Sequence, residues 1–124
     1  MSQSGKIQLV LLITATAEQA KEGYRLFNSH AEWMEETHFK DGDKALLNYN
    51  VSSAPELSNP MDPTSEPTGN TNFILSEVYE TMVGIEDHFS QAQGSWDDFP
   101  DFIKWLGGCK STMVPGALIA YSLW

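Results

Sequence analysis

Residues 73–89, FILSEVYETMVGIEDHF, carry a carboxylate, a phenol and an imidazole in one short segment. Glu77 and Tyr79 are two residues apart in an alternating apolar pattern, so they share a strand face with Phe73 and Leu75. A carboxylate on an apolar face indicates either a pocket acid with a raised pKa or a residue paired at a subunit interface. The sequence leaves both interpretations open.

His88 follows in a helical pattern, at the edge of the apolar stripe formed by Met82, Ile85 and Phe89. An imidazole with an ordinary pKa near 6.5 can exchange a proton with a phenolic substrate at neutral pH. The alternative is a partly buried imidazole that hydrogen-bonds a backbone carbonyl or a carboxylate such as Glu77. His88, Tyr79 and Glu77 are therefore the candidate catalytic residues.

Three further residues are candidates for ligand binding. His30 and Trp33 lie three residues apart at the flank of a predicted helix, where an aromatic wall beside a base would suit a flat ligand. Ordinary helix packing explains the Trp equally well. Asn48 shares a strand face with Asn50 and is placed either to bind a polar ligand group or to face solvent at a sheet edge.

Metal-binding patterns are weak in this sequence. Glu35 and His38 have the Glu-x-x-His spacing of carboxylate-bridged di-iron helices, which require paired copies, and the chain has one copy; adding His30 gives only an imaginable three-ligand set. Cys109 is the single cysteine, which excludes a thiolate cluster within one chain. No glycine-rich phosphate loop, serine nucleophile elbow or zinc signature is present. We expect no metal and no cofactor.

The segments that position these side chains are predicted to follow the order strand, helix, strand, strand, helix, short helix, strand. Apolar alternation predicts strands over 6–14, 44–53, 72–80 and 112–123. A capping box at Thr16 begins a long helix that ends before Asp41, with a predicted core stripe of Ala20, Tyr24, Phe27, Ala31, Met34 and His38. Thr81 is placed to cap a second helix, and a short third one falls within 94–108. Residues 54–70 hold four prolines and are predicted to be a long loop.

This order of elements is the split βαβ pattern of a ferredoxin-like α+β domain with a four-stranded antiparallel sheet. We expect one domain over 1–124, with a flexible start at 1–5. Helices on one sheet face leave the second apolar face of the strands uncovered, and the sheet of a second copy would cover it. The sequence therefore predicts a homodimer.

The charge balance excludes some partners. Seventeen Asp and Glu against seven Lys and Arg give a formal net charge of −10, and the basic residues are scattered along the chain. Phosphate backbones and anionic membranes would be repelled, so we expect no nucleic-acid or membrane partner. The start lacks a basic segment and a cleavage site, and the apolar run after it is too short to span a bilayer, so a cytoplasmic location is expected.

Two segments resemble those of the dimeric α/β-barrel superfamily, and within it the antibiotic biosynthesis monooxygenase-like group. The first segment is FILSEVYETMVGIEDHF, which is similar to that group's strand with Glu and an aromatic residue, followed by a turn and a helix with His. The second is DGDKALLNYNV, which contains Tyr49 and is similar to the group's acidic-Gly segment that leads into a strand. The resemblance implies two ferredoxin-like subunits that pack into a barrel, each with a small-molecule pocket between sheet and helices.

Members of the group include cofactor-free oxygenases of electron-rich aromatic compounds and haem-degrading enzymes. The haem-degrading pattern is absent, because Thr14 and Tyr79 stand where Asn and Trp are needed, and no His follows Ser90. The resemblance thus implies a cofactor-independent, oxygenase-like enzyme for a small aromatic or polyketide-like compound. The alternative is a non-catalytic homodimer that binds a small ligand or serves as a structural module.

Overall fold

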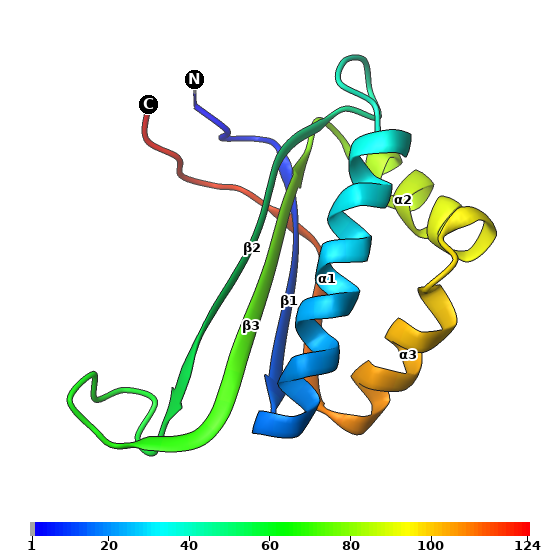
Figure 1. Ribbon diagram of the computed structural model, residues 1–124. Coiled ribbons are helices and arrows are strands. Elements are labelled where there is room, and N and C mark those ends of the chain that lie inside the picture. Colours follow the sequence, from blue (N-terminus) through cyan, green and yellow to red (C-terminus); the bar gives the residue numbers. More distant parts are fainter. Residues whose placement is uncertain (1) are drawn as a thin grey trace.

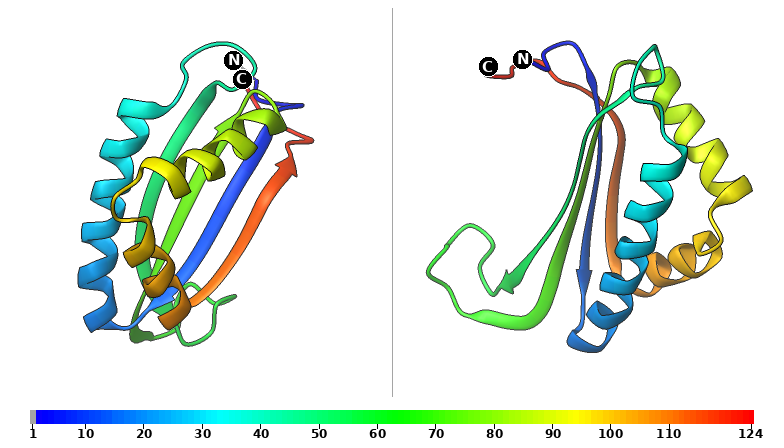
Figure 2. Two further views of the ribbon diagram at one scale, coloured as in Figure 1. Left: turned by 90° about the vertical axis from the view of Figure 1, so that its right-hand side faces the viewer. Right: turned by 45° about the horizontal axis from the view of Figure 1, so that its top comes forward.

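Residues 2–124, which the computed structural model describes, form one antiparallel sheet with three helices on one of its faces (Figures 1 and 2). The strands are β1 (Ile7–Ala15), β2 (Leu46–Leu57), β3 (Pro67–Tyr79) and β4 (Lys110–Leu118). The helices are α1 (Ala17–Thr37), α2 (Met82–Ser95) and α3 (Phe99–Gly108). This order confirms the predicted ferredoxin-like α+β arrangement.

The sheet has the strand order β2-β3-β1-β4, so the apolar β1 lies inside it. The register pairs Leu9 with Glu77 and Ile13 with Phe73, which places these residues of β1 and β3 on the face that the helices cover. Continuous apolar character on both alternate sets is typical of such a central strand.

Local capping signals start the first two helices where the sequence predicts. Thr16 and Gln19 form a reciprocal capping box, in which the Gln19 amide donates to Thr16 Oγ1 at 3.2 Å and the Thr16 amide donates to Gln19 Oε1 at 2.8 Å. At α2, the Val83 amide donates to Thr81 Oγ1 at 3.1 Å.

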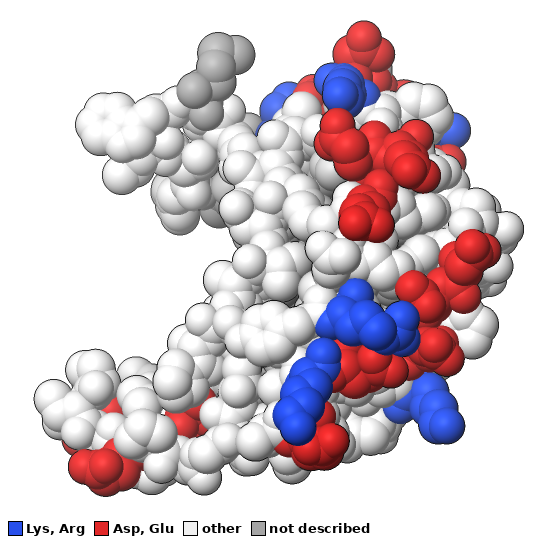
Figure 3. Space-filling view, viewed as in Figure 1, with Lys and Arg blue, Asp and Glu red and all other residues white. Residues whose placement is uncertain are grey.

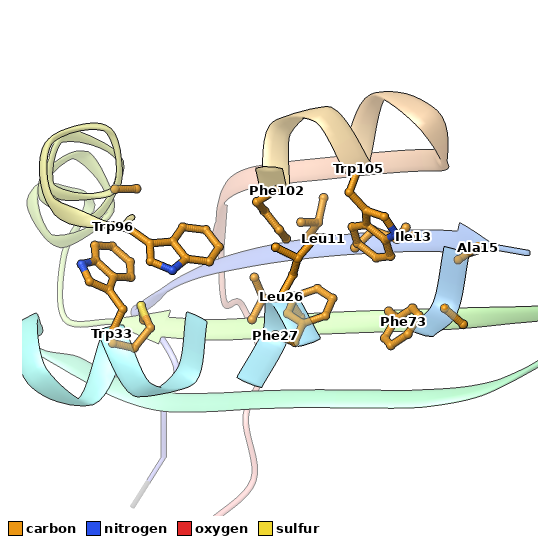
Figure 4. Packing of buried hydrophobic residues seen from close by; sticks show 14 residues of the cluster. Leu11, Ile13, Ala15, Leu26, Phe27, Trp33, Phe73, Trp96, Phe102 and Trp105 are labelled. Carbon is orange, nitrogen blue, oxygen red and sulfur yellow. The ribbon is translucent and has the colours of Figure 1, made fainter. Parts of the chain in front are cut away.

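Aromatic side chains fill the core between the sheet and the helices. In Figure 4, Phe27 of α1 lies beside Phe73 of β3 and the side chains of α3. Phe27 meets Phe102 and Trp105 edge to face, at ring centroid distances of 5.7 and 5.9 Å. Gly23 makes this packing possible, because a Cβ there would lie 2.5 Å from Trp105 Cζ2.

The predicted core stripe of α1 was partly wrong. Tyr24 is 55% exposed, although it was expected in the core. The buried residues of α1 are Ala20, Gly23, Leu26, Phe27, His30, Trp33 and Met34. The stripe is wider than predicted because α1 packs against the sheet and against α3 and the residues that follow α2, so a second set of side chains is covered.

The predicted loop over 54–70 was also too long. Strand β2 continues to Leu57 and β3 begins at Pro67, so the connecting loop spans only 58–66. Because β2 is an edge strand, it tolerates a residue without an amide hydrogen, and Pro55 pairs with Thr71.

The last strand ends earlier than predicted, at Leu118 rather than Leu123, because Leu118 pairs with Ile7, the first residue of β1. Beyond it, Ile119 O accepts a hydrogen bond of 2.8 Å from the Gly5 amide, and the Gln3 amide donates to Ser122 Oγ at 3.0 Å. Residues 2–5, expected to be a flexible start, therefore contact the C-terminal segment. No helix within residues 2–124 combines the length and apolar character needed to cross a membrane.

The sheet face opposite the helices is not covered by any element of residues 2–124 (Figure 2). Leu12, Ile74 and Val114 on this face are 43%, 41% and 46% exposed. Figure 3 shows that most of the hollowed side carries uncharged side chains, with acidic ones at its lower end, while most charged side chains lie over the helices. The uncovered face is thus largely apolar or neutral, with Glu56 and Lys110 at the end near the β2–β3 loop.

Candidate functional site

Three ionisable side chains are buried together between the sheet and the helices. His30 of α1, Glu77 of β3 and His88 of α2 are 2%, 0% and 4% exposed. One nitrogen or oxygen atom from each lies within 4.8 Å of the others. We call this group the His–Glu cluster.

Glu77 has a single hydrogen bond. Tyr79 Oη donates to Glu77 Oε1 at 2.5 Å, across two residues of the same strand face. Glu77 Oε2 is buried without a hydrogen-bond partner, and no Lys or Arg in residues 2–124 forms an ion pair with this carboxyl group. Burial raises the pKa of Glu77 to about 7, and the hydrogen bond from Tyr79 opposes part of that rise.

His88 lies between a second imidazole and the carboxyl group of Glu77. Its Nδ1 is 2.8 Å from His38 Nε2 and 3.7 Å from Glu77 Oε1. Burial lowers the pKa of His88 to about 2, and the neighbouring His30 and His38 lower it further. His88 is therefore neutral at physiological pH, which suits it to hydrogen bonding or metal ligation more than to carrying a proton.

His30 is held by a residue of the neighbouring strand. Its Nδ1 is 2.8 Å from Tyr49 Oη, and the two rings stack at a centroid distance of 5.6 Å. Burial lowers the pKa of His30 to about 3 and raises that of the Tyr49 phenol above its ordinary value. The hydrogen bond occupies Nδ1, so Nε2 is the nitrogen left available for a ligand.

A cavity of about 250 Å³ lies next to the His–Glu cluster. Among the described residues, His30 and His88 are the only ionisable side chains that line it, and the remaining lining is apolar or aromatic. That lining consists of Leu9, Leu11, Leu75, Phe89, Ala92, Trp96, Phe99, Phe102, Ile103, Leu106 and Met113. The arrangement, a largely apolar pocket with a few polar groups, is typical of small-molecule sites.

The structure brings most of the predicted site residues together. Glu77, Tyr79, His88 and His30 converge, and Trp33 packs against His88 at a ring centroid distance of 5.6 Å. The Trp33 indole nitrogen donates to Ser95 Oγ at 3.0 Å, so this ring also ties α1 to the end of α2.

Two of the sequence patterns are not part of the cluster. Asn48 pairs with Val78 on the uncovered face of the sheet, where it is exposed and accepts a hydrogen bond from Asn50. Glu35 is exposed and paired with Lys40 at 3.6 Å, so the Glu-x-x-His spacing does not bring its carboxylate to the cluster.

His38 and Tyr49 contact the cluster, although the sequence named His38 only in the weak Glu-x-x-His pattern and Tyr49 only in the family resemblance. Their partners are far along the chain, and no spacing rule joins residues separated in this way. The one usable signal was strand pairing, because Tyr49 faces Glu77 across the β2–β3 ladder and therefore shares its sheet face.

The fold and the site together define a ferredoxin-like α+β domain with an apolar pocket between its helices and its sheet. No protein-family model and no curated protein matches the chain. Two solved structures are similar to it in fold.

The first is a Deinococcus radiodurans protein that has been proposed to be an antibiotic biosynthesis monooxygenase; it is 22% identical, with a TM-score of 0.56, over 95% of this chain and 98% of that chain. The second is a dimeric ferredoxin-like protein from an uncultured marine organism, 11% identical with a TM-score of 0.58, over 94% of this chain and 99% of that chain. The predicted resemblance to the antibiotic biosynthesis monooxygenase-like group is thus confirmed at the level of the fold.

Proposed function

We propose that this protein is an enzyme that binds a small, flat aromatic or polyketide-like compound between its sheet and its helices and acts on it in an oxygenase-like reaction with dioxygen. The observation that carries the proposal is the apolar, aromatic-lined cavity whose ionisable lining side chains, among the described residues, are two neutral imidazoles. The fold shared with a protein proposed to be a monooxygenase supports the reaction class.

The cavity favours a ligand with one polar edge. Trp96, Phe99 and Phe102 offer aromatic faces and edges to a planar ring system. A ligand hydroxyl can donate a hydrogen bond to the free nitrogen of His30 or His88, because both imidazoles are uncharged. A volume of about 250 Å³ lies below the usual range for drug-sized ligands, so the ligand is small.

Within this proposal, His88, Glu77 and Tyr79 form the reactive end of the pocket. His88 lines the cavity directly, while Glu77 and Tyr79 lie behind it along β3. His30 and Trp33 contribute to the walls around His88. Asn48 has no place in this pocket because it lies on the other face of the sheet.

A thermal-shift experiment with hydroxylated naphthalenes and anthraquinones tests the proposal. We expect these compounds to raise the melting temperature of the wild type but not that of Met113→Trp, a variant that fills the cavity from a half-exposed position. Val83→Lys is the control, because Val83 of α2 has an exposure similar to that of Met113 and does not line the cavity. No stabilisation of the wild type, or the same stabilisation in Met113→Trp, would contradict the proposal.

A non-catalytic ligand-binding protein is the second candidate. It is favoured by the low pKa of His88, which makes this imidazole a poor proton acceptor. Oxygen consumption separates the two candidates. A compound that stabilises the protein and is oxidised with uptake of dioxygen supports the enzyme, while stabilisation without uptake for every bound compound supports the binding protein.

We also propose that two copies pair through their uncovered sheet faces to form a dimeric α/β barrel. The support is the exposed apolar group of Leu12, Ile74 and Val114, the uncharged surface over most of the hollowed side in Figure 3, and the dimeric state of a structural neighbour. Burial of this face removes apolar surface from water, which is the driving force for association.

A further inference from the structure

We propose that His30, Glu77 and His88 bind a divalent first-row transition-metal ion. The three side chains come from α1, β3 and α2, and one donor atom of each lies within 4.8 Å of the others. All three residues are less than a twentieth exposed. This site departs from the sequence-based expectation of no metal, because its ligands are brought together by the fold and share no spacing.

The distances are close to those that coordination requires. Metal bonds of about 2.1 Å place neighbouring ligand atoms roughly 3.0 to 3.5 Å apart in octahedral or tetrahedral geometry. Glu77 Oε1 and His88 Nδ1, which hold the hydrogen bonds to Tyr79 and His38, are 3.7 Å apart, so the two side chains lie next to each other. One donor atom of each residue lies within 4.8 Å of the others, so binding of the ion requires these atoms to move closer together.

The second observation is the unsatisfied carboxylate oxygen. Glu77 Oε2 is the only buried side-chain nitrogen or oxygen in the described part of the chain without a hydrogen-bond partner. Leaving such an atom unpaired in the interior is energetically unfavourable, because it has lost its hydrogen bonds to water. A bound cation would supply both the partner and the positive charge that no Lys or Arg of residues 2–124 provides.

Each proposed ligand also has a supporting hydrogen bond, as metal ligands usually do. Tyr49 holds His30 through Nδ1, His38 holds His88 through Nδ1, and Tyr79 donates to Glu77 Oε1. These contacts leave Nε2 of each imidazole and Oε2 of Glu77 as the atoms for the metal ion. The rings of Trp33 and Trp96 pack against these two imidazoles.

The donor set selects the class of ion. Two imidazoles and one carboxylate suit Fe²⁺, Co²⁺ or Zn²⁺, whereas Mg²⁺ and Ca²⁺ prefer oxygen ligands throughout. Three protein ligands leave coordination positions open. Because His30 and His88 also line the cavity, those positions would be accessible from it. The metal proposal does not depend on an aromatic ligand.

Titration of chelator-treated protein with Co²⁺, followed by visible absorption and calorimetry, tests the site. We expect one Co²⁺ ion per chain in the wild type and at least about tenfold weaker binding by Glu77→Gln and His30→Gln. Glu80→Gln is the matched control, because this half-buried carboxylate lies three residues further along the chain and pairs with Lys6. Its affinity for Co²⁺ should equal that of the wild type.

Equal binding by wild type and Glu77→Gln would overturn the proposal, because the ion would then lie on the surface of this acidic chain. Absence of Co²⁺ binding would also overturn it. Proton NMR of the wild type tests the site without a variant. Co²⁺ bound at the site should strongly shift the resonances of two imidazoles, and unshifted imidazole resonances would contradict the site. The thermal-shift screen in chelator reports separately on the aromatic ligand, so either proposal can fail alone.

Discussion

The buried carboxyl group of Glu77 makes the free energy of unfolding depend on pH. Its pKa is about 7 in the folded, metal-free chain and 4.5 without the fold's influence. The folded state therefore binds the proton more tightly, so this stabilising contribution is complete below about pH 4.5 and is lost as the pH rises through 7. The lowered pKa values of His30, His38 and His88 have the opposite effect on the unfolding free energy. The stability that these neutral imidazoles contribute is present above about pH 6.5 and is lost on acidification.

The Glu77→Gln substitution isolates the contribution of the Glu77 carboxyl group to the pH dependence of the unfolding free energy. Relative to this variant, the wild type should lose up to about 3 kcal/mol of unfolding free energy between about pH 5 and pH 8, because only the wild type releases the proton. Urea unfolding in the presence of a chelator at several pH values measures the difference. Glu80→Gln should show no comparable trend. A difference between the wild type and Glu77→Gln that stays constant across this range would contradict the raised pKa.

At the scale of single residues, the sequence predicted the face on which a side chain lies better than the side chains that it contacts. Strand alternation placed Glu77 and Tyr79 on one face, and helical spacing placed His88 beside a core stripe, both of which depend on neighbours in the chain. The contacts of His88 with His38 and of His30 with Tyr49 join separate elements. Local patterns do not contain that information, and the assembly of the His–Glu cluster followed only from the packed structure.

At the scale of elements, helix α2 approaches the sheet through a glycine. A Cβ at Gly84 would lie 2.7 Å from Tyr79 Cδ1 and 3.0 Å from the Lys44 carbonyl oxygen. Tyr79 also holds Glu77, so a shift of its ring would disturb the His–Glu cluster. Glycine at this position is therefore part of what positions the site.

Two alanine substitutions in α2 should have opposite effects. Gly84→Ala should destabilise the protein by about 1–3 kcal/mol, because the added methyl group overpacks the contact with Tyr79 and the backbone. Gly94→Ala, near the exposed end of the same helix, meets no atom within 4 Å and should stabilise by up to about 1 kcal/mol. Thermal or urea unfolding compares them. Similar effects of the two substitutions would mean that the close approach at Gly84 is absent.

Element order and helix starts were predictable because capping and periodicity are local properties, as the Thr16 and Thr81 caps show. The ends of the strands were not. Leu118 ends β4 because β1 supplies no further partner, and Pro55 is accepted because β2 lies at the edge of the sheet. Both outcomes depend on strand order, which is a property of the whole sheet.

At the scale of the whole molecule, the uncovered sheet face leads to a test of assembly. Light scattering should give a mass twice the 13.8 kDa of one chain. Ile74→Lys places a charge next to Leu12 in the centre of this face and should shift the mass toward that of one chain. Val83→Lys has similar exposure on the helical side and should remain dimeric. A single-chain mass for the wild type would refute the barrel dimer.

The placement of the tryptophans has a spectroscopic consequence. The rings of Trp33 and Trp96 lie 5.6 Å from the His88 ring and 4.9 Å from the His30 ring, respectively, whereas Trp105 packs near Gly23 and Trp124 is 91% exposed. Intrinsic fluorescence therefore contains a built-in reporter of the pocket. A quencher that binds at the imidazoles should lower the fluorescence of Trp33 and Trp96 more than that of Trp105 and Trp124. The fluorescence of the unlabelled protein can therefore report whether this site is occupied.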